Sequence, residues 1–214
     1  MKALVLDFGG PVLRTPFELL RGGERRAGLA PGSLAWSGPF DPAADAEWRR
    51  MQAGETTERA YWQDRAAEFA ALTGADAGFR GLMDVLFDGE ERELVRPEAR
   101  LLVHAAHAAG LAVAVCTNDL QAFHSPEWVA RMSVLGDVDL LVDGSVEGVL
   151  KPDPRIYALV TERLGVAAEE CVFVDDQPGN VAGAVAVGMR AVLFDVTDPS
   201  RSYAEAREAL GLPG

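Results

Sequence analysis

Five short runs of mainly apolar residues recur along the chain, and polar residues follow each of them. The runs lie at residues 3–6, 111–116, 139–142, 171–174 and 191–194. Because apolar residues follow one another in these runs instead of alternating with polar ones, the pattern indicates strands that are buried on both faces. Such strands are typical of a parallel sheet that is covered by helices.

Segments with a helical pattern lie between and after these runs, at residues 98–109, 126–135, 154–164, 179–187 and 198–210. Two starts carry a capping residue followed by proline, Ser125-Pro126 and Asp153-Pro154, and Gly165 marks the end of one helix. Strands that alternate with helices predict an α/β fold with a Rossmann-like, doubly wound parallel sheet.

Residues 16–88 differ from the rest because they contain no comparable strand run. Amphipathic stretches predict four helices there, at residues 16–27, 42–52, 57–72 and 76–87. Loops rich in glycine and proline separate the first two and end the third. We therefore predict a helical insert, 16–88, within a core domain formed by residues 1–15 and 89–214.

Composition excludes several classes of partner. The 214 residues include 33 acidic and 20 basic side chains, a formal net charge of −13. This balance opposes nucleic acid or an anionic membrane as a partner, since both attract basic patches. No apolar run approaches the roughly 18 residues of a membrane-spanning helix, and the first residues lack a signal-peptide pattern. Two widely separated cysteines fit a reducing compartment, so we expect a cytoplasmic protein.

Polar residues that can carry chemistry follow three of the runs, and a lysine precedes one helix. These residues are Asp7, Thr117, Asn118, Asp175, Asp176 and Lys151. In open α/β sheets, ligands bind at the carboxyl ends of the strands. Each residue alone is common in turns, but together at one edge they predict a functional site. Lys151 stands out because the chain has only one other lysine, Lys2.

Four segments resemble, in order, the motifs of the haloacid dehalogenase (HAD) superfamily. They are residues 4–13 around Asp7, 115–118, 151–157 and 172–180. The third and fourth are most similar to those of small cytoplasmic phosphatases related to the amino-terminal domain of epoxide hydrolases. The resemblance implies a Rossmann-like core, and it implies that the helical insert is a cap that closes over the site.

The resemblance also implies a reaction and a metal. Asp7 would be the nucleophile that attacks phosphorus and forms an aspartyl-phosphate. Asp7, Asp176 and the backbone carbonyl of Gly9 would hold Mg²⁺, with Asp175 as a direct or indirect ligand. Three neighbouring carboxylates repel one another without a cation, so the residues themselves argue for a metal as well.

Other residues of the motifs would bind the phosphoryl group of a small phosphorylated substrate. Thr117 would hydrogen-bond a phosphoryl oxygen, helped by the backbone amide of Asn118 and by Gly10. Lys151 would offset the negative charge of Asp7 and of the phosphoryl group.

Position 9 departs from the family pattern. The usual first motif is Asp-x-Asp, whose second aspartate protonates the leaving oxygen and later activates water, whereas this chain has Gly9; Pro11 also replaces the usual threonine. General acid–base catalysis contributes about 10²–10⁴-fold, so its loss favours a slow enzyme or one selective for good leaving groups. Glycine also permits a left-handed backbone at position 9, which would oppose an aspartate there.

Three functions therefore stay open. The first is magnesium-dependent hydrolysis of a small phosphate ester. The second is a dehalogenase or related C–X hydrolase, because a halide leaves without a proton. The third is a catalytically silent relative that binds a phosphorylated metabolite or a protein. His124 is the candidate for a replacement proton donor, whereas His104 and His107 are expected at the surface and Cys116 and Cys171 in the core.

Overall fold

A computed structural model describes residues 1–74 and 78–213. The chain divides into two compact units. Met1–Arg14 and Glu90–Gly214 form the first, called here the core unit, and Thr15–Gly89 form the second, called the insert unit. The start of the helix expected at 76–87 lies outside the described residues.

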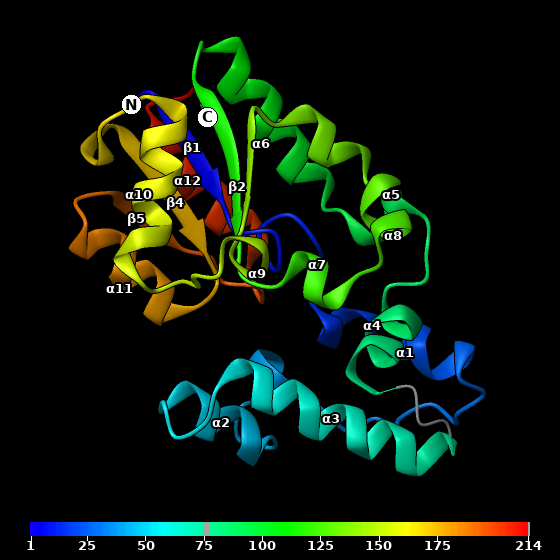
Figure 1. Cartoon of the computed structure of the whole chain (residues 1–214). Coiled ribbons are helices and arrows are strands. Elements are labelled where there is room, and N and C mark those ends of the chain that lie inside the picture. The colour runs from blue at the N-terminus through cyan, green and yellow to red at the C-terminus, as the bar shows by residue number, and fades with distance from the viewer. Residues whose placement is uncertain (75–77, 214) are drawn as a thin grey trace. The chain divides into compact units, whose positions relative to one another are not determined.

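The core unit is built on one parallel sheet (Figure 1). Its strands are β1 (Ala3–Leu6), β2 (Ala112–Thr117), β3 (Leu140–Asp143), β4 (Cys171–Asp175) and β5 (Arg190–Leu193). They lie in the order β3-β2-β1-β4-β5, so β1 is central, with Ala3 opposite both Ala112 and Cys171. The predicted Rossmann-like α/β fold is confirmed.

Helices cover both faces of this sheet. The core-unit helices are α5 (Glu91–Leu94), α6 (Pro97–Ala108), α7 (Leu120–Phe123), α8 (Pro126–Ala130), α9 (Gly144–Glu147), α10 (Pro154–Leu164), α11 (Pro178–Ala186) and α12 (Pro199–Leu210), with 3₁₀ turns at Ser133–Asp137 and Ala168–Glu170. α10 and α11 pack together against the sheet, as do α6 and α12. All four residues of β1 are fully buried, which explains why its sequence is continuously apolar.

The predicted helix signals are confirmed at three positions. Ser125 caps α8 and Asp153 caps α10 with their side chains, and Gly165 ends α10 in the left-handed conformation. The single helix predicted for 126–135 is wrong, because α8 stops at Ala130 and a 3₁₀ turn follows. The backbone amide of Val134 donates to the Glu91 carboxylate at 2.8 Å, so it does not continue the α-helical hydrogen bonding.

The insert unit consists of helices. They are α1 (Pro16–Arg26), α2 (Ala46–Gln52), α3 (Glu58–Thr73) and α4 (Gly78–Leu86), with a 3₁₀ turn at Gly38–Phe40. α2 begins four residues later than the predicted 42–52 because Asp45 is its N-cap and accepts a hydrogen bond from the Trp48 amide. Rings of Phe17, Trp48, Tyr61 and Trp62 pack edge-on or tilted in its interior.

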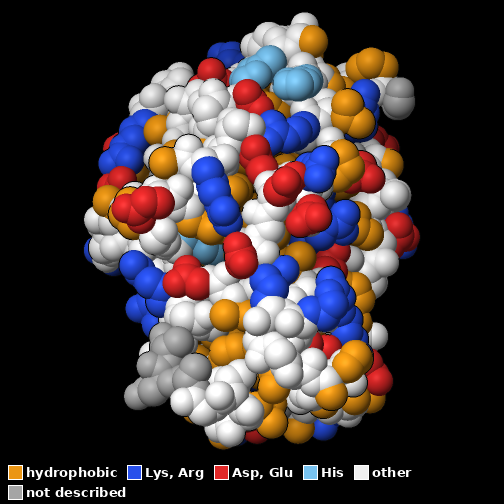
Figure 2. All heavy atoms as spheres, turned by 90° about the vertical axis from the view of Figure 1, so that its right-hand side faces the viewer, with side chains coloured by type: hydrophobic (Ala, Val, Ile, Leu, Met, Phe, Trp, Pro, Cys, Tyr) orange, Lys and Arg blue, Asp and Glu red, His pale blue; other side chains and the backbone are white. Residues whose placement is uncertain are grey.

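The surface carries charges of both signs. Acidic and basic side chains are interspersed on the face shown in Figure 2. The ion pairs of the core unit include Arg163 with Glu147, at 2.6 Å, and Arg201 with Glu205, at 2.8 Å. Among the helices of the described residues, none has the length and apolar character to cross a bilayer.

Candidate functional site

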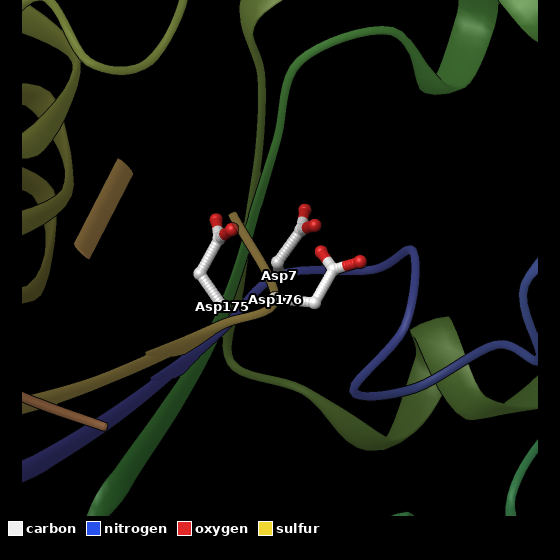
Figure 3. Close-up of side chains that lie close together, drawn as sticks. All are labelled: Asp7, Asp175 and Asp176. Atoms are coloured by element: carbon white, nitrogen blue, oxygen red, sulfur yellow. The ribbon is translucent and has the colours of Figure 1, made fainter. Parts of the chain in front are cut away.

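Three carboxylates meet at the carboxyl edge of the sheet. Asp7 follows β1, Asp175 ends β4 and Asp176 comes next. Each can place one oxygen within 4.8 Å of the others, and the three side chains extend in the same direction from the strand ends (Figure 3). The chain runs from β1 outward to β2 and β3 on one side and to β4 and β5 on the other. The carboxylates therefore lie at the point where strand order reverses, the usual ligand site of such sheets.

Lys151 is buried among these carboxylates. Its Nζ lies 2.7 Å from Oδ1 of Asp7 and 2.7 Å from Oδ2 of Asp175, and it donates to the carbonyl of Cys116 at 2.8 Å. An ammonium has three N–H groups, so these three acceptors match its donors. Although burial by itself lowers the pKa of Lys151, the charges of Asp175 and Asp7 raise it well above its ordinary value. The side chain is therefore a fixed positive charge beside Asp7.

Asp175 is fully buried and surrounded by donors from the protein. Besides Lys151, it accepts hydrogen bonds from the Gln177 amide at 2.8 Å and from Nδ2 of Asn180 at 3.1 Å to both oxygens. Of the two roles considered for Asp175, this geometry favours the indirect one. Sequence reasoning gave Asn180 no role, and its place in the first turn of α11, five residues after Asp175, was the available signal.

Asn118 joins the second and third motifs through its side chain. Its Oδ1 accepts from the backbone amide of Lys151 at 2.7 Å, and its Nδ2 donates to the Lys151 carbonyl at 3.2 Å. This reciprocal pair fixes the backbone that carries the buried ammonium, a role that the sequence did not indicate. Thr117 ends β2 and is 7% exposed, so it lies at the same edge of the sheet.

The loop after Asp7 contains two glycines in different conformations. The Phe8 amide donates to Oδ1 of Asp7 at 2.7 Å. Gly10 has a φ of 79°, and a Cβ there would lie 2.8 Å from Cγ of Asp176, so only glycine fits. Gly9 is outside the left-handed region, and its Cβ would meet only Oδ2 of Asp7, at 3.9 Å. The left-handed backbone that glycine would permit at position 9 is found at Gly10 instead, one residue later.

Other candidates from the sequence lie as follows. Cys116 and Cys171 are buried as predicted, and burial raises the pKa of their thiols to about 12 and about 11. His104 and His107 are exposed as predicted. His124 is 4% exposed, and its ring stacks on Trp128 with centroids 3.7 Å apart. Its proposed role as a proton donor stays a prediction.

The residues present fit a hard divalent cation. Asp7 and Asp176 offer carboxylate oxygens at one edge. The backbone of Gly9 lies near the first of them, since a Cβ on Gly9 would be 3.9 Å from Oδ2 of Asp7. Mg²⁺ is bound in proteins by one or two carboxylates and retains several waters. A carboxylate pair beside a fixed ammonium can therefore bind a cation and an anionic substrate at once.

Comparisons with known proteins agree with these motifs. Residues 1–188 match the family model of haloacid dehalogenase-like hydrolases. Phosphatase MT3486 of Mycobacterium tuberculosis is 38% identical over 106 residues, 49% of this chain and 48% of that protein. Phosphoserine phosphatase of Thermus thermophilus is 32% identical over 162 residues, 75% of this chain and 57% of that protein. The chain thus spans about half the length of these two relatives.

Dehalogenases are also among the similar proteins. (S)-2-haloacid dehalogenase 4A of Burkholderia cepacia is 25% identical over 199 residues, 90% of this chain and 82% of that protein. Among solved structures, the putative HAD-hydrolase YfnB of Bacillus subtilis, bound to magnesium, has a TM-score of 0.71 at 15% identity and covers 99% of both chains. At that identity the likeness concerns the fold.

Proposed function

The chain belongs to the haloacid dehalogenase-like hydrolase family, and from this premise we propose that it is a magnesium-dependent phosphatase of a small phosphate ester. Relatives named phosphatases support this reaction class. The observation that carries the proposal is the surroundings of Asp7. Its carboxylate contacts the buried ammonium of Lys151 and lies within 4.8 Å of the carboxylate of Asp176.

Asp7, Asp176 and the backbone carbonyl of Gly9 would hold Mg²⁺. The ion, when bound, supplies positive charge that neutralises the phosphoryl oxygens and orients them toward the nucleophile. Asp175 stands outside this set, because its oxygens already accept four hydrogen bonds within the protein. We assign Asp175 to holding Lys151 in place.

In the proposed reaction, an oxygen of Asp7 forms a bond to phosphorus while the bond from phosphorus to the leaving oxygen breaks. Lys151 orients the Asp7 carboxylate for this attack, because its ammonium is itself held by Asp175. The hydroxyl of Thr117 and the backbone amide of Asn118 bind phosphoryl oxygens. Water then attacks the phosphorus of the aspartyl-phosphate, which releases phosphate and restores Asp7.

Glycine at position 9 determines, in this proposal, which leaving groups the enzyme favours. No carboxylate follows two residues after Asp7, so the leaving oxygen takes its proton from solvent or from the substrate. Aryl and acyl phosphates have stabilised leaving groups and depend less on that proton. We therefore propose that they are hydrolysed faster than alkyl phosphates.

The insert unit contains a cavity of its own. We assign this unit the part of a cap that selects the substrate. It contains a cavity of about 310 Å³ whose lining includes the rings of Phe17, Trp36 and Phe40 together with Arg21 and Ser37. Aromatic rings favour flat groups, and the polar groups among them fix orientation.

A dehalogenase is the second candidate function. It is favoured by Gly9, since a halide needs no proton on leaving, and by the similarity to (S)-2-haloacid dehalogenase 4A. The Asp176 carboxylate beside Asp7 weighs against it, because a carbon–halogen substrate gives no reason for a cation site.

A substrate panel separates the candidates. We would measure turnover of p-nitrophenyl phosphate, acetyl phosphate, glycerol phosphate and 2-chloropropionate, each with magnesium and with a chelator. Phosphate release that requires magnesium and is fastest on the first two substrates is the expected result. Halide release that is insensitive to the chelator would favour the dehalogenase. No turnover in any arm would leave the silent binder and contradict both enzymes.

A further inference from the structure

Two side chains from different helices hold successive carbonyl groups of the loop after Asp7. Nε of Arg96, at the N-terminus of α6, donates to the carbonyl of Gly10 at 2.7 Å. The hydroxyl of Tyr203, in α12, donates to the carbonyl of Pro11 at 2.6 Å. Both donors come from helices on the same face of the sheet, and both reach residues far away in the sequence.

Both side chains are buried and share one packing partner. Arg96 is 3% exposed and Tyr203 is 5% exposed. The Arg96 guanidinium lies 5.7 Å from the centre of the Phe194 ring, and the Tyr203 ring meets that ring edge-on at 5.1 Å. The Phe194 amide donates to the carbonyl of Asp175 at 2.9 Å. The two donors are therefore anchored to the end of β4, where the carboxylates lie.

The carbonyl that Arg96 holds belongs to Gly10, the residue of this loop with a left-handed backbone conformation. Gly10 has a φ of 79°, and its Cα is so close to Asp176 that a Cβ would lie 2.8 Å from Cγ of that residue. Fixing the Gly10 carbonyl fixes this close approach. The Gly9 carbonyl belongs to the preceding peptide and is joined to this one through the Cα of Gly10. Burying a guanidinium costs free energy unless it is hydrogen-bonded, and the Gly10 carbonyl accepts one of the hydrogen bonds that satisfy Arg96.

We propose that Arg96 and Tyr203 are positioning residues that set the Gly9–Pro11 backbone against Asp176, and so set the affinity of the site for Mg²⁺. This inference rests on the proposed function, in which the Gly9 carbonyl and Asp176 hold the metal. Neither side chain touches substrate. Their removal is expected to weaken metal binding and to lower kcat, with little change in KM once magnesium saturates.

The sharpest variant is Tyr203→Phe, which removes one hydroxyl and keeps the ring against Phe194. Arg96→Lys keeps the charge but cannot reproduce the planar donor, and Arg96→Ala opens a space for ethylguanidinium added to the buffer. Arg100→Ala is the matched control, because Arg100 lies one turn further along α6 and pairs with Glu91 and Asp137 at the surface of that helix.

Magnesium binding would be measured by titration calorimetry without substrate, alongside kcat, KM and thermal unfolding. We expect the dissociation constant for Mg²⁺ to rise about threefold in Tyr203→Phe and about tenfold in Arg96→Lys. Ethylguanidinium should restore part of the affinity of Arg96→Ala. Arg100→Ala should lower the unfolding temperature without changing the dissociation constant. Loss of stability in the Arg96 and Tyr203 variants with unchanged magnesium affinity would overturn the proposal.

Hydrogen exchange of the 8–13 backbone amides separates this inference from the proposed function. Faster exchange in Tyr203→Phe and Arg96→Lys, but not in Arg100→Ala, is expected if these residues position the loop. Unchanged exchange would overturn the positioning role. A wild-type protein that binds no magnesium would overturn the proposed function and the metal part of this inference, whatever the loop does.

Discussion

Nζ of Lys151, in the turn that precedes α10, lies 2.7 Å from Oδ1 of Asp7. The same nitrogen contacts Asp175 and the Cys116 carbonyl. Its three N–H groups therefore point to three different acceptors. A compact ammonium satisfies this geometry, whereas a planar guanidinium with its donors spread over a fork does not.

Lys151→Arg should therefore be costly although it keeps the charge. We expect kcat/KM to fall at least about tenfold, which is about 1.4 kcal/mol of transition-state stabilisation. The measurement is steady-state kinetics on p-nitrophenyl phosphate at saturating magnesium. Arg155→Lys, at an exposed pair with Asp153, is the control and should be neutral. Equal activity of Lys151→Arg and wild type would contradict the claim that a compact ammonium is required at position 151.

The pH dependence gives a second test of Lys151. Its pKa is raised above the ordinary 10.5 in the folded state, so its charged form is favoured by folding. This contribution to stability is complete below the unfolded value and is lost only as the pH rises through the higher, folded value. Activity and unfolding temperature should thus show no loss from this group up to about pH 9. An alkaline limb below that pH that disappears in Lys151→Arg would contradict this.

Asp7→Asn should abolish turnover while the protein stays folded. The amide has the same shape but cannot attack phosphorus, and Lys151 keeps Asp175 as its partner. Phosphate release and circular dichroism would be measured on the same sample. A variant that hydrolyses the substrate at the wild-type rate would show that Asp7 is not the nucleophile.

Gly9→Asp should raise alkyl-phosphate turnover more than aryl-phosphate turnover, because only the alkyl leaving group needs the proton. The backbone at Gly9 accepts a side chain, since a Cβ would meet only Oδ2 of Asp7 at 3.9 Å. The measured quantity is the ratio of glycerol phosphate to p-nitrophenyl phosphate rates.

Two variants control for this substitution. Gly9→Ala adds a Cβ without an acid and should leave the ratio unchanged. Gly10→Ala should disturb the site, because its Cβ would lie 2.8 Å from Cγ of Asp176 at a positive φ. A wild-type protein that already prefers glycerol phosphate would mean that another group donates the proton, and His124→Ala would then be tested first.

Asp175→Asn should destabilise the core unit. The carboxylate accepts from Lys151, Gln177 and Asn180, whereas an amide offers one oxygen and turns a donor toward other donors. We expect a loss of about 3 kcal/mol in the free energy of unfolding, the scale of a broken buried ion pair. Denaturant unfolding would be compared with Asp153→Asn, which keeps a partly exposed N-cap and should not change stability measurably. Equal stability of the two variants would contradict the assigned role.

Glu24→Gln tests the insert unit. Although burial by itself raises the pKa of Glu24, hydrogen bonds from the Leu34 amide, Arg21 and the Gly32 amide hold it below the ordinary 4.5. The ionised form is therefore stabilised by folding, and its contribution is present above the unfolded value and lost as the pH falls through the folded one.

We expect Glu24→Gln to cost about 2 kcal/mol at neutral pH, with the difference from wild type narrowing below about pH 4. Tryptophan fluorescence would report on this unit, because it contains Trp36, Trp48 and Trp62 of the four tryptophans. Glu47→Gln, at an exposed pair with Arg50, is the control. A difference that does not depend on pH would contradict a role for the ionised carboxylate.

Much of the fold could be predicted because runs of consecutive apolar residues mark the buried strands. A strand covered on both faces must be apolar throughout, so β1 and β4 are visible as runs that begin at Ala3 and Cys171. The polar residues that end such runs must emerge at one edge of a parallel sheet. Asp7, Thr117 and Asp175 could therefore be assigned to one site without coordinates.

The sequence could not distinguish the parts played by neighbouring residues. Asp175 and Asp176 look alike in the sequence, but Asp175 ends β4 and is fully buried, whereas Asp176 follows the strand and is partly exposed. One carboxylate is consequently enclosed by Lys151 and Asn180, and the other lies against Gly10. Glycine at positions 9 and 10 is equally permissive, and only the structure shows that Gly10 is the left-handed one and that Asp176 leaves no room there for a side chain.

By itself, then, the sequence determined the strands, most of the helices and the edge of the sheet where the chemistry lies, because hydrophobic burial and strand ends are local properties. The tertiary structure decided which atoms meet there. The side chain of Asn118 hydrogen-bonds the backbone of Lys151. Arg96 and Tyr203 donate hydrogen bonds to the loop after Asp7. These contacts join segments far apart in the chain, and their distances depend on strand order and helix packing, which no local pattern encodes.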